Sequence, residues 1–162
     1  MEIGATKAVQ DRLKTTKIEE SKGASLVFCW DTHLTKIKGR NVLFIVNASN
    51  RYTIAMTDIE PRNWNYYAMY IIRVIHGMMQ EMGYSEEQIE QYFKMSGDTT
   101  ITKTHGRKSV GGINRMVMDA QYFGKKLEKE AKYQWELSEY LNRDICQPEG
   151  FDAYGYPNEL FK

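Results

Sequence analysis

An unbroken run of five apolar residues at positions 42–46 (VLFIV) constrains the fold of this chain more than any other feature. The run is rich in β-branched residues and lacks the polar alternation of a strand with one solvated face. Further short β-type segments flank it at 26–30, 33–37 and 52–57, and polar or glycine-containing turns separate them. The sequence therefore predicts hairpins, and hence antiparallel pairing, with residues 42–46 in the middle of a sheet.

Apolar residues at helical spacing follow this β-rich part. Pro61 suits the first turn of a core helix whose apolar positions continue to Met82. Ser85 and Gln88 have the spacing of a capping box, which predicts a second helix at 86–95. A short strand at 101–104 should precede a last helix.

The last helix is expected to begin at about residues 109–112 and to continue to about residue 141. Its first half has apolar residues at helical spacing, and its second half has opposite charges four residues apart, at Glu128, Lys132 and Glu136. The predicted fold is therefore α+β, with a small, mainly antiparallel sheet of four to five strands, packed helices and a long C-terminal helix. Residues 1–123 would form the compact domain, and residues 124–162 a helical extension with an irregular tail.

Composition excludes several classes of protein. The two cysteines, Cys29 and Cys146, are far apart in sequence and have no histidine at metal-ligand spacing, so we expect free thiols, no metal and no cofactor. No apolar run is long enough to cross a membrane, and the first residues lack the apolar core of a signal peptide. A cytoplasmic protein is expected.

Charge is unevenly distributed although the net charge is only +1. Residues 99–126 hold six Lys or Arg against one acidic residue, whereas the segments on either side are acidic. A basic face attracts polyanions such as nucleic acids through counterion release. An ordinary solvated surface is the alternative interpretation.

The segment 103–112 (KTHGRKSVGG) concentrates this charge just before a predicted helix. Free amide groups at a helix N-terminus, together with arginine, favour a phosphate group. The spacing is not that of a phosphate-binding loop of nucleotide hydrolases. Alternatively, the glycine pair permits close helix packing and Arg107 pairs with an acidic residue such as Asp98. The candidate residues for an anion or nucleic acid are Arg40, Lys103, Thr104, Arg107, Lys108, Ser109, Gly111 and Asn114.

Two other candidate sites are weaker. Asp31 and His33 share one face of a predicted strand, and with His105 they would suit acid–base chemistry. A histidine of this kind is more often a hydrogen-bonded structural residue. A sparse apolar stripe on the C-terminal helix suggests a protein partner or a homodimer. Its residues are Leu127, Ala131, Trp135 and Leu141.

Two stretches of the sequence, at 27–47 and 101–114, resemble an uncharacterised family of bacterial, plasmid and phage domains. In that family a tryptophan precedes an arginine-containing hairpin that ends in asparagine, and a Lys-Thr-x-x-Arg element leads into Gly-x-x-Asn. The matching residues are Trp30, Leu34, Arg40, Asn47, Lys103, Thr104, Arg107, Gly111 and Asn114.

The resemblance covers about residues 1–123 and implies a compact α+β domain. The family often has Trp-His-Ala-Asn-Leu where this chain has Trp30-Asp31-Thr32-His33-Leu34, and the tail from Gly124 is expected to be peculiar to this protein. The family's distribution suggests an accessory protein of a phage or plasmid.

The leading functional hypothesis is a non-enzymatic module that binds nucleic acid or a nucleoprotein complex through a basic surface. An inhibitor of a host-defence complex, such as an anti-CRISPR protein, is one form of it. The alternative is a small metal-independent nuclease or phosphotransfer enzyme that uses His33, His105 and Arg107.

Overall fold

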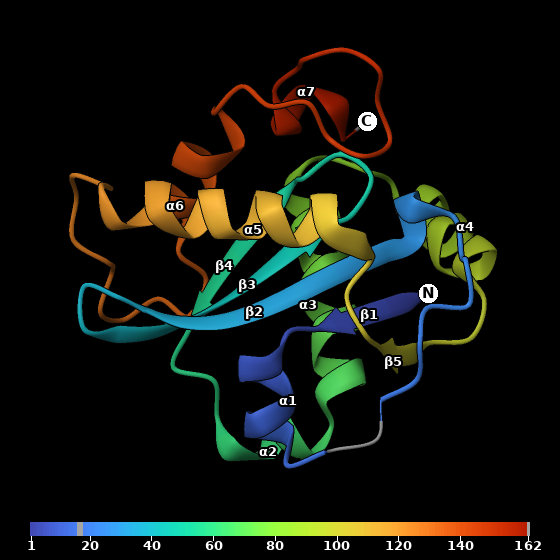
Figure 1. Cartoon of the computed structure of the whole chain (residues 1–162), viewed down its shortest axis with the longest axis horizontal. Coiled ribbons are helices and arrows are strands. Elements are labelled where there is room, and N and C mark those ends of the chain that lie inside the picture. Colours follow the sequence, from blue (N-terminus) through green and yellow to red (C-terminus); the bar gives the residue numbers. More distant parts are fainter. Residues whose placement is uncertain (16–17, 162) are drawn as a thin grey trace.

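The computed structural model describes residues 1–15 and 18–161, and within them a five-stranded sheet packs against seven α-helices (Figure 1). The strands are β1 (Glu2–Ala5), β2 (Cys29–Ile37), β3 (Arg40–Asn47), β4 (Thr53–Thr57) and β5 (Thr100–Thr102). The helices are α1 (Lys7–Leu13), α2 (Pro61–Asn65), α3 (Tyr67–Glu81), α4 (Glu86–Ser96), α5 (Gly106–Gln121), α6 (Trp135–Asn142) and α7 (Pro157–Leu160). The predicted α+β class is confirmed.

The sheet is mixed, with strand order β4-β3-β2-β1-β5. Hairpins join β2, β3 and β4 as antiparallel neighbours, as the turn residues predicted. β1 lies between β2 and β5 and is parallel to both. Residues 42–46 are buried and β3 lies between β4 and β2, which confirms an interior strand covered on both faces, although β2 rather than β3 is the central strand of the sheet.

Two predicted boundaries were wrong. The segments 26–30 and 33–37 do not form two strands, because Leu26–Phe28 makes a short 3₁₀ turn and one strand, β2, follows. The core helix that begins at Pro61 is interrupted at Tyr66, which separates α2 from α3. The capping box of α4 is present with both of its bonds, between Ser85 and Gln88.

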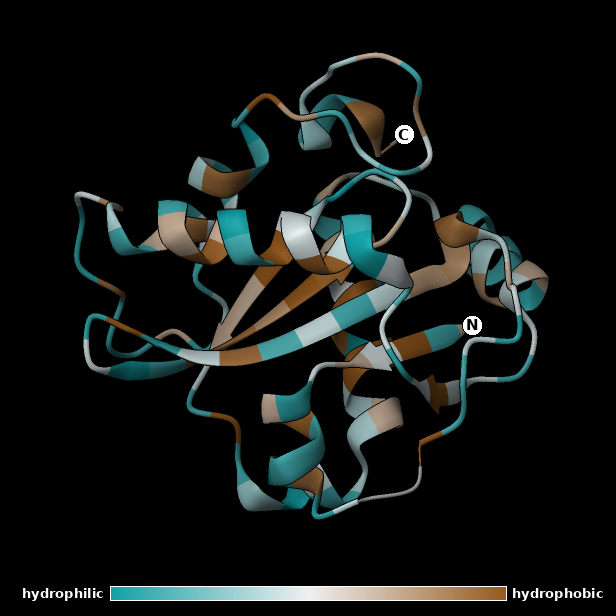
Figure 2. Cartoon of the chain, in the orientation of Figure 1, coloured by the Kyte–Doolittle hydropathy of each residue, from teal (hydrophilic) through white to brown (hydrophobic). Residues whose placement is uncertain are grey.

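Helices cover both faces of the sheet. On one face α3 packs against β2, β3 and β4, and its buried residues Ile71 and Ile75 belong to a core with Trp30, Ile45 and Ile54. On the other face α5 and α6 pack over β3 and β4 in a second core. Figure 2 shows that β3 and β4 beneath α5 are largely apolar. The exposed residues of α5 are mostly polar, whereas those of α6 include Trp135 and Tyr140.

The long C-terminal helix was not found. α5 ends at Gln121, an irregular segment follows, and α6 has only eight residues. The reason is that this segment is bound to the open edge of β4. The carbonyl of Lys132 accepts a bond of 2.7 Å from Thr57 N–H, and Gln134 N–H donates to Ala55 at 2.9 Å. These backbone groups are therefore not available for helical bonds.

Side chains of α6 complete the cover of the β4 edge. Asn142 accepts from Thr53 N–H at 2.7 Å and donates to the carbonyl of Thr53 at 2.9 Å. The Ser138 hydroxyl accepts from Ala55 N–H at 3.0 Å. Leu127 and Leu141 are buried in the second core, whereas Trp135 is 44% exposed. Residues 127–142 are thus packed onto the sheet.

No helix in the described part of the chain is both long enough and apolar enough to cross a membrane.

Candidate functional site

The loop between β5 and α5, together with the first part of α5, contains all but one of the candidate residues for an anion or nucleic acid; Arg40 is the exception. α5 begins at Gly106, three residues before the earliest predicted start, and His105 occupies the N-cap position. Gly106 has φ +90°, a left-handed conformation that glycine adopts without strain. The loop therefore turns sharply and directs the His105 side chain into the protein.

Strand register places a polar cluster beneath this end of α5. Glu2 of β1 pairs with Cys29 of β2, and Gly4 pairs with Asp31, so the side chains of Glu2, Cys29 and Asp31 lie on the α5 face of the sheet. Gly4 is required there, because a Cβ atom at this position would lie 1.8 Å from Asp31 Oδ1. The missing side chain makes room for the carboxylate.

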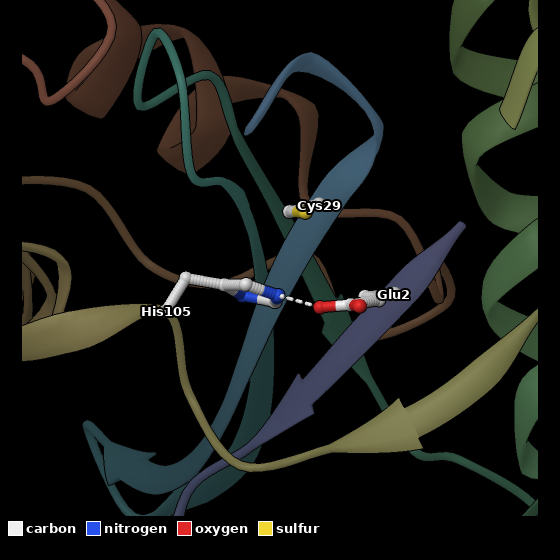
Figure 3. Close-up of side chains that lie close together, drawn as sticks. All are labelled: Glu2, Cys29 and His105. Atoms are coloured by element: carbon white, nitrogen blue, oxygen red, sulfur yellow. Dashed lines mark hydrogen bonds and ion pairs between the residues drawn. The ribbon is translucent and has the colours of Figure 1, made fainter. Parts of the chain in front are cut away.

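His105 lies between two carboxylates. Its Nδ1 is 2.7 Å from Asp31 Oδ1, and its Nε2 is 3.0 Å from Glu2 Oε2. Figure 3 shows Glu2, Cys29 and His105 converging from β1, β2 and the loop before α5. The His105 side chain is 3% exposed and that of Asp31 is fully buried. The cluster is therefore an ionic network closed off from solvent.

Both carboxylates have further partners. The Ser21 hydroxyl donates to Glu2 Oε2 at 2.6 Å, and Lys22 N–H donates to Oε1 at 2.8 Å. Asp31 accepts from His105 N–H at 3.2 and 3.3 Å and from the Ser109 hydroxyl. Asp31 thus binds the N-terminus of α5, where the sequence suggested an external anion. The Ser109 hydroxyl donates its hydrogen bond to Asp31 and is therefore not available to an external anion.

The network holds His105 in its charged form. Burial opposes the charge, but the hydrogen bond and the negative charge of Asp31, with a smaller contribution from the neighbouring Cys29 side chain, outweigh burial and raise the pKa of His105 to about 10. For Glu2, burial acts against ionisation, yet hydrogen bonds from Ser21, Lys22 and His105 lower its pKa below the ordinary value. An imidazolium between two carboxylates is the form that fits this geometry.

The outward side of α5 has a different character. Arg107, Lys108, Gly111, Asn114 and Arg115 are exposed. No acidic residue occurs from residue 99 to residue 118. The cations on this side are therefore available to a partner in solvent.

The exposed cations are only loosely held by the protein. Lys108 Nζ reaches the carbonyl of Pro148 at 3.3 Å, and Arg115 lies 3.9 Å from Asp119. Lys103 forms an exposed ion pair with Glu20. The expected pairing of Arg107 with Asp98 is not among the ion pairs of the described residues.

A cavity of about 420 Å³ lies beside α5, between the β3–β4 turn and the C-terminal segment. Its basic lining residues are Arg51, Lys108 and Arg115. Its acidic ones are Asp119, Asp144 and Glu149. The Arg51 guanidinium lies against α5, because a Cβ atom at Gly112 would be 1.8 Å from its Nη2. Gly112 therefore creates the space that Arg51 occupies.

Sequence reasoning missed Arg51, Glu2 and the role of Cys29. Arg51 closes the β3–β4 turn with φ +64°, and across the described residues it forms no ion pair. The signal that pointed to it was the glycine pair 111–112, which can admit a bulky group from another element. Glu2 and Cys29 become neighbours only through the parallel pairing of β1.

The other candidate residues lie elsewhere. Arg40 binds the Asp58 carboxylate, the Thr57 hydroxyl and, at 2.7 Å, the carbonyl of Glu128, all at the far end of β3. His33 Nδ1 is 3.1 Å from the Thr6 hydroxyl, and burial lowers its pKa. The structure brings Asp31 and His105 into contact. The hydrogen bonds found for His33 and for Arg40 go to other residues, not to Asp31 or His105.

The comparison with known proteins gives one result. A family described as Domain of unknown function (DUF6933) matches residues 2–160. The match continues well beyond residue 123, where the resemblance noted from the sequence was expected to end. No curated protein and no solved structure gives a significant match.

Proposed function

Because the chain belongs to the family described as Domain of unknown function (DUF6933), a name that assigns no activity, we propose a function from the site alone: the chain binds nucleic acid through the outward side of α5. The observation that carries this is the cavity beside α5, which Arg51, Lys108 and Arg115 line from two different elements. A nucleic acid in this role implies a cytoplasmic protein.

Arg51 supports a phosphate as the group that is bound. A guanidinium that lacks a carboxylate partner presents donors in the fork geometry that suits a phosphate. The acidic residues of the cavity come from the C-terminal part of α5 and from the segment after α6, and none of them forms an ion pair with Arg51 among the described residues.

An extended anion suits the outward side better than a small one. Arg107 is exposed next to the cavity, and the helix surface there carries only small or polar residues, such as Gly111 and Asn114. A backbone of regularly spaced phosphates can contact Arg107 and the cavity cations together. Lys103 can join them by exchanging its exposed partner Glu20, since such ion pairs contribute little.

A protein that covers nucleic acid or a nucleoprotein complex in this way can act as an inhibitor. An accessory protein of a phage or plasmid that blocks a host-defence complex is the biological form that we propose. The resemblance noted in the sequence supports it.

The experiment is fluorescence anisotropy of the whole chain with labelled single-stranded DNA, single-stranded RNA and duplex DNA, between about 50 and 200 mM salt. The triple variant Arg107→Gln, Lys108→Gln, Arg115→Gln should bind more weakly. The slope of log K against log salt should become shallower by about 2–3, because each lost phosphate contact removes a little less than one unit.

A matched control has the same change of net charge at the other end of α5. Lys125→Gln, Lys126→Gln, Lys129→Gln removes three exposed lysines that follow α5. It should leave the slope within about half a unit of the wild type. Equal losses in the two triple variants would show unspecific attraction and would refute the site, as would the absence of binding at low salt.

A nuclease built on Asp31 and His105 has less support. The nitrogen atoms of His105 are both engaged by carboxylates, and the ring is 3% exposed, so neither nitrogen faces a phosphodiester. A gel of the same mixtures tests this alternative directly. Cleavage that disappears in His33→Ala would replace the binding function by an enzymatic one.

A further inference from the structure

We propose that Glu2, Cys29 and His105 bind a transition-metal ion of the zinc class beneath the N-terminus of α5. The ligand atoms are a carboxylate oxygen, the Sγ atom of Cys29 and Nε2 of His105, and all three lie within 4.8 Å of one another. All three residues are buried, and Figure 3 shows the elements from which they come. The site is separate from the outward side of α5 and does not depend on nucleic-acid binding.

The distances suit a tetrahedral ion. Nε2 of His105 and Oε2 of Glu2 are 3.0 Å apart. Two ligands that are each about 2.0–2.1 Å from zinc at a tetrahedral angle are about 3.3 Å apart. An ion can therefore replace the proton between these atoms with little movement. A thiolate at about 2.3 Å from zinc lies about 3.6 Å from the other ligand atoms, so from a separation of up to 4.8 Å the Cys29 Sγ atom must approach by up to about 1.2 Å. It then leaves its weak bonds to the carbonyls of Ala24 and Ser25.

The surroundings orient the ligands before any ion arrives. Asp31 binds Nδ1 of His105 and thereby directs Nε2 toward Glu2, which is the carboxylate–histidine–metal arrangement of many zinc sites. Asp31 is fixed in turn by the Ser109 hydroxyl. Glu2 is fixed by Ser21 and by the backbone of Lys22.

The choice of metal follows from the ligand types. A nitrogen, a sulfur and an oxygen ligand favour zinc or a related transition metal, and they disfavour magnesium and calcium, which select oxygen alone. A divalent ion that displaces the proton on Nε2 and the proton of the Cys29 thiol leaves the net charge of the buried cluster unchanged. The burial of the site then adds no new electrostatic penalty.

Cobalt(II) is the probe, because thiolate-bound Co²⁺ absorbs in the near ultraviolet and tetrahedral Co²⁺ absorbs strongly in the visible. Titration of the reduced full chain should give both bands with one ion per chain. Zinc should remove them by competition, and magnesium should not. Absence of the bands in the folded wild-type protein would overturn the site.

The two cysteines provide a matched pair of variants. Cys29→Ser should lose the near-ultraviolet band, and its affinity for cobalt should fall at least about tenfold, whereas Cys146→Ser should bind as the wild type does. Asp31→Asn should retain the band with an affinity about 10–100-fold lower, because Asp31 positions His105 without touching the ion. Loss of the band in Cys146→Ser, or its persistence in Cys29→Ser, would refute the assignment.

Alkylation of the cysteines in the wild-type protein tests the site without any variant, and so it remains informative if a variant does not fold. Zinc should slow the alkylation of Cys29 by iodoacetamide, followed by mass spectrometry, and should leave the alkylation of Cys146 unchanged. Equal rates at Cys29 with and without zinc would contradict metal binding there.

Discussion

The two sides of α5 use charge in opposite ways. The inward side consists of His105 and Ser109. They contribute one cation and one hydroxyl to the buried cluster, and both bind the carboxylates of Glu2 or Asp31. The outward side carries Arg107, Lys108 and Arg115, which have weak partners or none among the described residues. The comparison shows that neighbouring residues of one basic segment hold the fold together or face solvent according to the side of the helix that they occupy.

Removal of His105 should have the largest effect. His105→Ala leaves Glu2 and Asp31 buried without their common cation, and we expect a loss of about 3–5 kcal/mol in the free energy of unfolding. His76→Ala is the control, because His76 is 38% exposed and its ion pair with Glu86 spans 3.6 Å. It should cost less than about 1 kcal/mol. Urea denaturation measures both free energies of unfolding. Equal losses in His105→Ala and His76→Ala would mean that the buried cluster contributes no more to stability than an exposed ion pair.

Alkaline pH should weaken the inward side through the same residue. His105 has a pKa of about 10 in the folded chain against an ordinary value of 6.5. Its contribution is therefore complete below pH 6.5 and is lost as the pH rises toward 10. We expect a decline on the order of 2–4 kcal/mol in the metal-free protein across this interval.

At acidic pH the free energy of unfolding should change in the opposite direction, because it should fall as the pH is lowered. Glu2 has a lowered pKa, so its contribution is present above its ordinary value of 4.5 and is lost as the pH falls through the folded value. Stability should therefore be greatest between these limits. An NMR titration of the imidazoles checks the assignment, since His105 should stay protonated at pH 8. Titration of His105 near 6.5 would contradict it.

Gly4→Ala tests how tightly the inward cluster is packed. The added Cβ would lie 1.8 Å from Asp31 Oδ1 and 3.0 Å from the backbone of Thr104, so the carboxylate must move. We expect a loss of about 1–3 kcal/mol. Gly77→Ala on α3 meets no atom within 4 Å and should be neutral or stabilising by up to about 1 kcal/mol. A Gly4→Ala protein as stable as the wild type would disprove the close packing.

The smallest effect concerns the outward side. Gly112→Ala displaces the Arg51 guanidinium, whereas Gly111→Ala meets no atom within 4 Å and differs by one position only. Gly112→Ala should weaken nucleic-acid binding about three- to tenfold, which is close to 1 kcal/mol, and Gly111→Ala should not. Anisotropy titrations compare the two variants, and identical affinities would remove Arg51 from the binding site.

Local signals predicted much of the fold. The apolar run 42–46, the hairpins on either side of it and the capping box at Ser85 depend on residues that are close in sequence. The parallel placement of β1 between β2 and β5 was not predicted, because parallel neighbours are joined by long connections that leave no local pattern.

The C-terminal half of the predicted long helix failed for a physical reason. Lys132 and Glu136 have the spacing of a helical ion pair, but Lys132 pairs with Glu60 and Glu136 with Lys125. The edge of β4 has backbone groups that need partners, and satisfying them outweighs a few weak surface pairs. The spacing of charges along the sequence gives no sign that this segment will hydrogen-bond to the edge of β4.

The polar cluster was predictable only in part. The sequence grouped Asp31 with His105 as titratable residues, and the structure places them in contact. Glu2 and Cys29 were missed, because their proximity depends on the register of β1 against β2. Asp31 also accepts a hydrogen bond from the backbone N–H of His105, the N-cap residue of α5, a role that no feature of the local sequence indicated.

The cover of the β4 edge has a consequence for synthesis of the chain. β4 leaves the ribosome long before residues 131–142, whose backbone and side chains close its edge. At about 5–20 residues per second, the nascent sheet presents unpaired strand groups for a period on the order of several seconds. During that interval the chain is most exposed to pairing with another copy, and premature termination before residue 131 would make the exposure permanent.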